Sequence, residues 1–416
     1  MPHVLGLRCI RCAKEHLTPG EGAPPLYVCA CGGNLQVAYD FAAIRKVVSH
    51  AAFAADAHRG IWRYHAFFPV RTQQLASRLD VGGTPLAFAP ALGAKLGLTR
   101  LHLKDDTRNP SASFKDRAGA VALAVAHERG EQVVAGASTG NAASSLACLA
   151  ARTGMKTVIF VPQTAPQAKV AQILLFGATV IAVRGTYDQA FDLCLEASRE
   201  FGWYNRNTGF NPYTREGKKT CAFEIAEQLG WQVPDFVFVS VGDGNILSGL
   251  WKGFVELKEA GLVERTPALV GVQAEKSNAV KLAFEGDGTL RPVSGETIAD
   301  SISVSLPRDG EAAVKALKDS GGFAVAVSDD EILEAMRVTA RTEGVFAEPA
   351  AAASVAGLAQ AVQAGRVPPN ATVVAVITGS GLKDVASAMK AAGAPHLIDP
   401  RLDSLKQLVS RERIAS

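Results

Sequence analysis

A lysine at the start of a predicted helix is the first residue whose position suggests chemistry. Lys115 follows a turn-forming Asn-Pro-Ser stretch, and Ser111 or Ser113 could cap a helix that begins near Phe114. The positive end of a helix disfavours a cation, and a neutral amine there is a nucleophile that can attack an aldehyde. This stretch alone leaves open the alternative of a surface lysine paired with Asp116.

A second turn whose residues could bind a substrate joins a predicted strand to a helix. It contains Ser138, Thr139, Gly140 and Asn141. The two hydroxyl groups could simply cap the helix. Hydroxyls, an amide and a glycine at one helix N-terminus also suit a carboxylate, and local capping would not call for Asn141. We therefore favour a site that binds the carboxylate of a substrate.

The third turn is rich in glycine and follows a predicted buried strand; it contains Gly242, Asp243, Gly244, Asn245 and Ile246. Closely spaced glycines let the backbone approach an anion, and the following helix, expected over 250–256, adds positive potential. The spacing matches neither a dinucleotide fingerprint nor a P-loop. It predicts a phosphate site, with a simple tight turn as the alternative.

Four of the seven cysteines lie near the N-terminus, as Cys9 and Cys12 and as Cys29 and Cys31. The two pairs resemble the knuckles of a zinc ribbon, which supplies four thiolates to the metal. The second pair has one intervening residue where a regular knuckle has two. Zinc binding and a ribbon-shaped remnant without metal both remain open. The other three cysteines are single residues in apolar or helical surroundings, which favours buried, reduced side chains.

Short apolar runs alternate with longer helical patterns from about residue 82 onward. The runs predict strands, several of which are continuous enough to be buried on both faces of a parallel sheet. The predicted strands are Leu101–Lys104, Gln132–Ala137, Thr157–Pro162, Thr179–Val183, Phe236–Val241, Ala268–Gln273, Ala324–Val327 and Thr372–Ile377. The helical patterns cover Ala165–Phe176, Tyr187–Phe201, Thr220–Leu229, Asp329–Thr342 and Ala350–Ala364. This alternation indicates an α/β fold with open, wound sheets, which bind ligands at the carboxyl ends of strands.

Composition limits the classes of function. The 416 residues carry a net charge of only +3 and no block of like charge, which argues against nucleic acid or a membrane surface as a partner. We find no signal peptide and no apolar run long enough to span a bilayer. The cysteine usage favours a reduced, cytoplasmic protein, and the length favours two or three packing units.

Taken together, the motifs resemble those of the threonine synthase family. The segment 109–117 is similar to the family signature Asn-Pro-Thr-Gly-Ser-Phe-Lys-Asp-Arg, and further matches follow in the family's order at 138–141, 211–212, 216–220, 242–246, 346–350 and 378–384. The resemblance implies a fold-type-II pyridoxal-phosphate enzyme, similar to tryptophan synthase β, with the cofactor between two wound-sheet domains. The expected division is a zinc-ribbon-like segment at 1–40, a large cofactor-binding domain at 41–120 and 220–395, a small domain at 121–219, and a tail at 396–416.

The resemblance also implies roles for individual residues. Lys115 would carry pyridoxal 5′-phosphate as a Schiff base and move protons on the substrate, and Phe114 would pack beside the ring. Asn141 would bind the 3′ oxygen of the cofactor, and Thr378 its pyridine nitrogen. The turn at 242–246 would bind the cofactor phosphate. Substrate contacts would come from Ser138, Thr139, Gly140 and Arg215, with Lys169 and Lys218 as further candidates for a substrate phosphate.

Some positions depart from the family pattern. Ala142 replaces the usual threonine after the Ser-Thr-Gly-Asn motif, and Ser380 replaces a common histidine. Thr214 occupies the usual arginine position, so the guanidinium of Arg215 is rotated by roughly 100° on a helix. The segment 300–308 replaces a usual Ile-Gly-Asn-Pro. These positions surround the substrate side chain more than the cofactor.

Three functions therefore remain open. The first is conversion of O-phospho-L-homoserine and water to L-threonine and phosphate by a lyase. The second is a related enzyme that acts at Cβ, such as a cysteate synthase or a threonine or serine dehydratase. The third is a cofactor-free binding or regulatory protein on the same scaffold, which would call for a broken Lys115 site. In the enzyme cases the expected partner is a small amino-acid substrate, phosphorylated in the first, and a homodimer fits such folds.

Overall fold

The computed structural model describes residues 3–19, 23–71, 74–75, 78–165 and 167–412. Parts of the predicted segment 1–40, residue 166 of a predicted helix and the last four residues of the predicted tail therefore lie outside the described residues. Three sheets organise the described chain, and two of them are wound α/β sheets, as the strand and helix alternation predicted. No helix in these ranges is long and apolar enough to cross a bilayer.

The large sheet has six strands in the order β12-β11-β10-β13-β5-β4 and is parallel except for its antiparallel edge strand β4. Its strands are β4 (Leu86–Phe88), β5 (Arg100–Asp105), β10 (Phe236–Ser240), β11 (Ala268–Ala274), β12 (Phe323–Val327) and β13 (Thr372–Ile377). Alternate residues enter two different apolar clusters, for example Val237 and Val239 in one and Phe238 in the other. Both faces are therefore covered by helices, which explains the continuous apolar runs.

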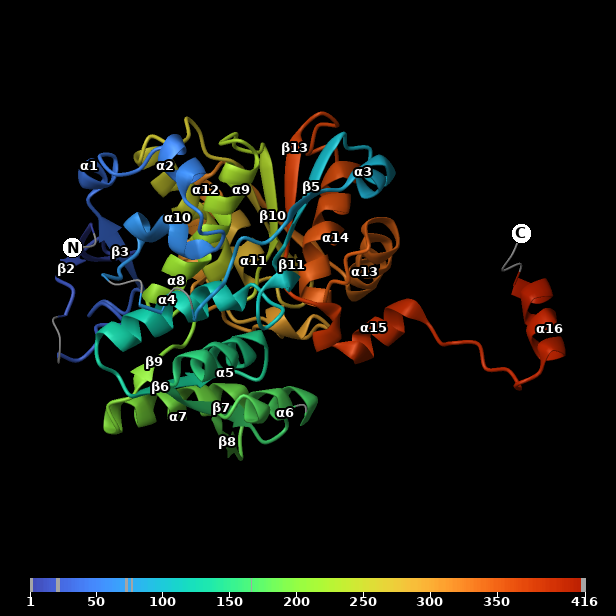
Figure 1. Cartoon of the computed structure of the whole chain (residues 1–416), viewed down its shortest axis with the longest axis horizontal. Helices are drawn as coiled ribbons and strands as arrows, with labels where there is room; N and C mark the ends of the chain where they lie inside the picture. Colours follow the sequence, from blue (N-terminus) through green and yellow to red (C-terminus); the bar gives the residue numbers. More distant parts are fainter. Residues whose placement is uncertain (1–2, 20–22, 72–73, 76–77, 166, 413–416) are drawn as a thin grey trace.

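The small sheet has four parallel strands in the order β8-β7-β6-β9. They are β6 (Val133–Ala137), β7 (Lys156–Pro162), β8 (Thr179–Val183) and β9 (Tyr204–Asn205). Ala135 and Phe160 pack on helix α7, whereas Val134 and Ile159 belong to the cluster that contains Leu146 of α5. Figure 1 shows this sheet and its helices beside the larger body, with α4 and α5 between the two.

Helices cover the sheets and connect their strands. They are α1 (Phe41–Ile44), α2 (His50–Ala55), α3 (Pro90–Leu96), α4 (Lys115–Glu128), α5 (Asn141–Thr153), α6 (Gln167–Leu175), α7 (Tyr187–Glu200), α8 (Tyr213–Lys218), α9 (Thr220–Gln228), α10 (Asn245–Glu259), α11 (Ala279–Glu285), α12 (Gly310–Asp319), α13 (Asp329–Glu343), α14 (Pro349–Gln363), α15 (Val385–Ala392) and α16 (Leu402–Glu412). Short 3₁₀ turns are η1 (Ile61–Phe67), η2 (Asp106–Arg108), η3 (Asp300–Ile302) and η4 (Gly381–Lys383).

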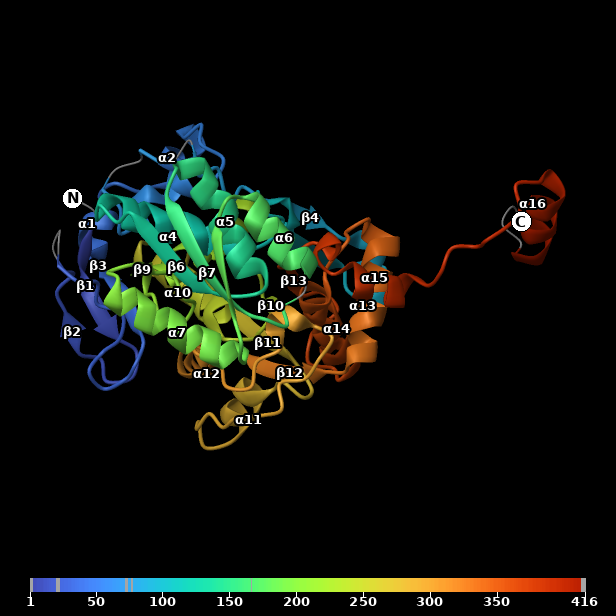
Figure 2. The same cartoon turned by 90° about the horizontal axis from the view of Figure 1, so that it is seen from below.

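The third sheet is a small antiparallel one at the N-terminus, β2-β1-β3, formed by Glu15–His16, Val4–Cys9 and Leu35–Tyr39. It carries the cysteine pairs and lies against the large body, with β3 next to α8. At the other end of the chain, α16 stands apart from the body at the end of an extended segment (Figures 1 and 2).

Two local expectations about helix starts were wrong. Helix α4 begins at Lys115 without a side-chain cap, because the hydroxyl and the N–H of Ser111 both donate to the carboxylate of Asp116 instead. Helix α10 begins at Asn245, five residues earlier than the predicted 250–256, so the glycine turn leads directly into it. Asp116 is fully buried and bonded to Ser111, which also excludes the surface pair with Lys115.

Candidate active site

A cavity of about 660 Å³ lies between the large and the small sheet, where β6, β10 and β13 end. The carboxyl ends of parallel strands from both sheets thus meet at one place, as expected for ligand sites in wound sheets. Most residues selected from the sequence line it: Lys115, Ser138, Thr139, Gly140, Asn141, Gly242, Asp243, Gly244, Asn245, Ile246 and Thr378. The structure therefore brings the three predicted turns together.

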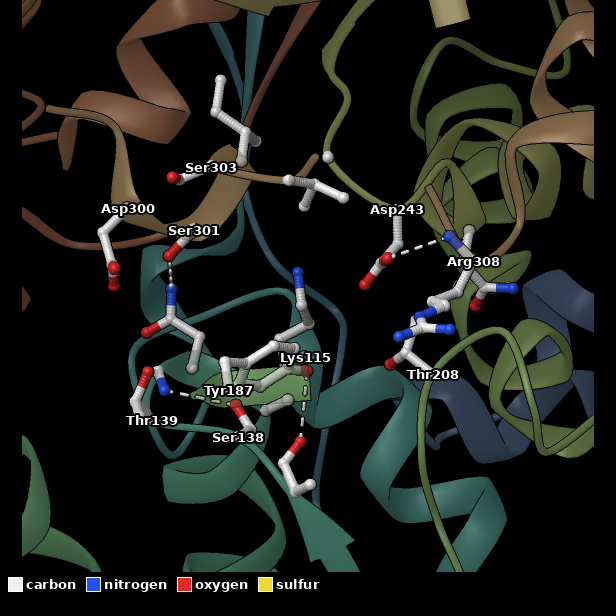
Figure 3. A pocket seen from close by; sticks show the side chains of 18 of the residues that line it. Lys115, Ser138, Thr139, Tyr187, Thr208, Asp243, Asp300, Ser301, Ser303 and Arg308 are labelled. Atoms are coloured by element: carbon white, nitrogen blue, oxygen red, sulfur yellow. Dashed lines mark hydrogen bonds between the residues drawn. The ribbon is translucent and has the colours of Figure 1, made fainter. Parts of the chain in front are cut away.

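Lys115 is the first residue of α4, and its side chain points into the open centre of the cavity (Figure 3). Its Nζ has no hydrogen-bond or ion-pair partner among the described residues. Burial lowers the pKa of Lys115, an effect that the carboxylates of Glu348 and Asp243 oppose and Arg206 reinforces. A half-buried amine without a partner and with a depressed pKa is suited to act as a nucleophile.

The turn after β6 differs from the capping alternative. Gly140 is the N-cap of α5 and no side chain caps the helix, so Ser138 and Thr139 are left to line the cavity. The amide of Asn141 donates to the two carboxylate oxygens of Glu348 at 2.8 and 3.0 Å. Burial raises the pKa of Glu348. This pair joins the two sheets across the site and holds the amide of Asn141 in one orientation.

The glycine turn after β10 presents an uncapped helix N-terminus to the cavity. Gly244 adopts φ 91°, which favours glycine, and α10 starts at the next residue with no side-chain cap. Lys218 lies beside this turn and donates to Asn245 Oδ1 at 2.6 Å. Burial, with the charges of Lys115 and Arg206, holds the pKa of Lys218 well below its usual range. The turn therefore combines free backbone N–H donors with a buried amine, an arrangement suited to an anion.

Arg206 is a second buried cation in the cavity wall. Its side chain is 2% exposed, forms no ion pair among the described residues, and leaves Nε without a hydrogen-bond partner. The one hydrogen bond of its guanidinium reaches the carbonyl of Lys115 at 3.4 Å. Burial lowers the pKa of Arg206 to about 10. The charge of Asp116 favours the protonated guanidinium but forms no ion pair with it. A buried guanidinium without an ion-pair partner is costly, which points to an anionic ligand.

Two selected residues lie outside the cavity lining. Phe114 is fully buried behind Lys115, and its N–H donates to the carbonyl of Thr378 at 2.8 Å. Arg215 forms an ion pair with Asp309 at 2.5 Å and donates to Ser248, beneath the glycine turn. The structure therefore does not bring the guanidinium of Arg215 to the cavity.

The segment at 300–308, noted as a departure from the family pattern, forms the wall opposite α4. Ser301 lies within 3.4 Å of the Asn141 amide, and the N–H of Arg308 donates to Asp243 at 3.1 Å. Lys169, a candidate for a substrate phosphate, is instead paired with Asp300 at the entrance to a second cavity of about 400 Å³. That cavity shares Asn141, Asp300, Ser301 and Glu348 with the first.

Sequence reasoning missed several lining residues: Tyr187, Arg206 and Thr208. Arg206 and Thr208 follow β9, a strand of two residues that no periodicity can reveal. These two residues follow the carboxyl end of a strand in the small sheet, which is where ligand sites are expected. That position can be recognised only from the pairing of β9 with β6.

Comparisons with known proteins identify the family. A model of the pyridoxal-phosphate dependent enzymes matches residues 77–379. A threonine synthase of Methanocaldococcus jannaschii is 38% identical over 405 residues, covering 97% of this chain and 98% of its own length. A threonine synthase of Methanosarcina acetivorans is 36% identical over 407 residues, with coverage of 97% and 98%.

Solved structures add evidence about the fold. A threonine deaminase of Solanum lycopersicum superposes with a TM-score of 0.67 at 22% identity, covering 81% of this chain and 94% of its own. Because the identity is low, this likeness concerns the fold alone and does not favour a dehydratase. The near-complete relatives are threonine synthases, and the cofactor-free alternative disagrees with both the family and the intact lysine. The chain belongs to the pyridoxal-phosphate-dependent enzymes of fold type II and, within them, to the threonine synthase family.

Proposed function

We propose that this chain converts O-phospho-L-homoserine and water into L-threonine and inorganic phosphate, with pyridoxal 5′-phosphate bound at Lys115. The observation that carries the proposal is the unpartnered amine of Lys115 between two uncapped helix N-termini, those of α5 and α10. Relatives that bear the threonine synthase name align over nearly the whole chain, which supports the same activity here.

The residues of the cavity fit the cofactor. A phosphate group suits the turn at 242–246, where the uncapped start of α10 and Lys218 supply donors and positive charge. Lys115 would hold the aldehyde carbon, Asn141 the 3′ oxygen and Thr378 the pyridine nitrogen. When bound, the cofactor supplies an electron sink for negative charge that develops beside the substrate amine.

The protein's own groups perform the remaining work. Ser138, Thr139 and Gly140 would hold the substrate carboxylate at the N-terminus of α5. The amine of Lys115 takes the proton from Cα and then assists loss of a proton from Cβ. The Cγ–O bond breaks and phosphate leaves, and Cγ is protonated to become the methyl group of threonine. The oxygen of water is then added to Cβ, and a proton is returned to Cα. The depressed pKa of Lys115 keeps a fraction of the amine neutral for these transfers.

Lys115→Ala tests the attachment of the cofactor. We expect the variant to lose the visible absorbance of the bound cofactor and to fail to trap it with borohydride. Phosphate release should fall by at least about 1,000-fold, because the general base is removed with the attachment point. Lys169→Ala, which changes a lysine already paired with Asp300, serves as the control. A colourless wild-type protein after incubation with the cofactor would contradict the proposal.

Arg206 is proposed to bind the phosphate of the substrate, since its buried guanidinium forms no ion pair in the described structure and its Nε has no hydrogen-bond partner. Arg206→Gln should raise the KM for O-phospho-L-homoserine by about 10- to 100-fold, the scale of a lost charge-assisted hydrogen bond. Cofactor absorbance should be retained. The measurement is phosphate release over a range of substrate concentrations, and an unchanged KM would assign the phosphate to other donors.

The predicted domain division, a homodimer and a cytoplasmic location also form part of the proposal. The division at 41–120 and 220–395 against 121–219 is supported by the membership of the strands in two separate sheets. A reducing compartment is supported by the seven cysteines, none of which forms a disulfide in the described structure. Arg215 is retained as a supporting residue of the glycine turn, because its guanidinium is paired with Asp309.

A further inference from the structure

The four N-terminal cysteines converge on one point. Their sulfur atoms all lie within 4.8 Å of one another. The Sγ of Cys31 is 3.5 Å from those of both Cys9 and Cys12, and the Sγ of Cys12 is 3.7 Å from that of Cys29. Cys9 and Cys29 are buried and the other two are exposed, so the cluster lies at the surface with one side covered by protein.

These separations match a tetrahedral metal site. Four sulfurs at about 2.3 Å from a zinc ion lie about 3.8 Å from each other. A disulfide would need about 2.05 Å between two sulfurs. The N–H of Cys12 also points to the Sγ of Cys9 at 3.5 Å, so the backbone already stabilises negative charge on that sulfur. Four thiolates in this geometry suit zinc.

Glycines explain how the short second knuckle reaches the same point. A turn closes through the N–H of Gly32, which donates to the carbonyl of Cys29 at 2.8 Å, and Gly32 adopts φ 78°. A Cβ at Gly33 would lie 2.7 Å from the Sγ of Cys9 and from the Cβ of Arg11. Two glycines therefore make the one-residue spacer possible. Gly32 adopts a positive φ that favours glycine, and Gly33 leaves room for the Sγ of Cys9 and the side chain of Arg11.

The cysteine cluster is connected to the glycine turn of the active site. Arg11, between the first two cysteines, donates to the carbonyl of Cys31 at 2.7 Å and forms an ion pair with Glu311 at 2.6 Å. Asn34, next to the second knuckle, donates to the carbonyl of Arg308 and to Asp309 Oδ1, both at 2.8 Å. Both knuckles therefore hold the segment at 308–311.

Asp309 connects Asn34 to the proposed cofactor site, because it also bonds residues of the glycine turn and of α10. It is 1% exposed, and its N–H donates to the carbonyl of Asp243 at 2.8 Å. Its Oδ2 accepts from Asn245 at 2.8 Å and from Ser248 at 2.6 Å. The aspartate therefore fixes the glycine turn and the first turn of α10 from behind, while Asn34 fixes the aspartate.

We propose that Cys9, Cys12, Cys29 and Cys31 bind one structural zinc ion, and that the zinc-bound knuckles hold Asp309 and hence the glycine turn in its binding conformation. Zinc replaces the thiol protons, which pass to solvent. The proposal of a metal site depends only on the geometry of the four cysteines. The link to the turn rests on the proposed cofactor role of residues 242–246.

Metal analysis of the full-length protein, purified without a metal-binding tag, tests the site. We expect one zinc per chain. Cys12→Ser and Cys31→Ser, which change the two exposed ligands, should each weaken zinc retention against a chelator by at least about tenfold, with circular dichroism to verify folding. Cys148→Ala changes a cysteine far from the cluster in sequence and should retain full zinc. Wild-type protein without metal after growth with zinc, or with iron in its place, would overturn the assignment.

Cofactor titration of the full-length apoprotein tests the link. Asn34→Ala should keep its zinc but bind pyridoxal phosphate at least about fivefold more weakly, the lower end of typical coupling between sites. Lys14→Ala, an exposed change on the same segment, should bind the cofactor normally. Equal affinity in Asn34→Ala and wild type would refute the link. Failure of the zinc-loaded wild type to bind the cofactor would instead refute the proposed function and leave the metal result intact.

Discussion

Lys115 shows how the surroundings of a single side chain create reactivity. An ordinary lysine on a protein surface is solvated and protonated, and it contributes little beyond charge. Lys115 is placed at a helix start, next to Arg206 and Lys218, where burial lowers its pKa. The residue type is common, and the burial and the neighbouring cations make it suitable for carrying an aldehyde cofactor.

Glu348 opposes this effect, and its charge yields a prediction about pH. While ionised, it raises the pKa of Lys115, so Glu348→Gln removes a charge that favours the protonated amine. The pKa of Lys115 should fall further, and the neutral amine should be present at lower pH. The pH midpoint for the rate of cofactor loading onto apoprotein should therefore move downward. An exposed change, Glu334→Gln, should leave the midpoint in place, and an upward movement would contradict the assigned role of Glu348.

At the scale of elements, helix α4 is fixed by a buried network of charges two residues beyond Lys115. Arg117 pairs with Asp106 at 2.6 Å and with Glu224 of α9 at 2.7 Å, and Lys104 of β5 pairs with Glu224 at 2.6 Å. Close packing complements these pairs, since a Cβ at Gly217 of α8 would lie only 1.8 Å from the carbonyl oxygen of Arg117. The start of α4 is therefore held against the large sheet from two directions.

This network predicts a dependence of stability on pH. Burial opposes the ionisation of Glu224, but the charges of Arg117 and Lys104 outweigh it and lower the pKa to about 2. In the unfolded chain the pKa of Glu224 should be about 4.3. Ionised Glu224 should therefore contribute about 3 kcal/mol to the free energy of unfolding above this pH, and the contribution should be lost as the pH falls towards 2.

Glu224→Gln should destabilise the protein by about 3–5 kcal/mol at neutral pH, because buried Lys104 loses its ion-pair partner and Arg117 loses one of two. The difference from wild type should shrink as the pH falls below about 4.3. Denaturant unfolding at several pH values measures both effects, with the exposed change Glu264→Gln as the control. A difference that stays constant down to acid pH would argue against ionised Glu224 in the folded protein.

At the scale of the whole molecule, the proposed active site forms where the large and the small sheet meet. The C-terminal arm, residues 396–416, contributes no residue to the cavity lining. Helix α16 has one buried residue, Leu408, and lies away from the body (Figure 1). Removal of residues 396–416 should therefore leave cofactor absorbance unchanged and kcat within about twofold, because the cavity lining lies entirely at 115–378.

The measurements are steady-state phosphate release, thermal unfolding and light scattering for mass. If the truncated protein unfolded at a clearly lower temperature or lost a dimeric mass, the arm would pack on the body or on a second copy. A truncation at Gly365, which removes β13 and Thr378, should abolish folding and gives the contrasting case.

The sequence by itself determined the chemistry of the turns and the character of the sheets. Apolar runs predicted eight strands of the wound sheets, with every end within one residue of its observed position. Most of these strands are buried on both faces and so show no polar alternation, whereas the edge strand β8 is largely exposed. The lysine was recognised because a cation is unfavourable at a helix start, and the other two turns because their glycines, hydroxyls and amide suit an anion. Local sequence could not show where each helix begins, as the cap expected at Ser111 or Ser113 and the helix expected to start at 250 illustrate.

Only the tertiary structure decided which charges are free. The sequence alone does not distinguish Arg215 and Lys169 from Arg206 and Lys218. In the structure, Arg215 is paired with Asp309 and Lys169 with Asp300. Arg206 and Lys218 instead line the cavity, and no carboxylate of the described structure forms an ion pair with them. It also decided that four cysteines with an irregular spacing meet within 4.8 Å. The reason is physical: pairing and convergence depend on distances between residues far apart in the chain, and local patterns carry no information about those distances.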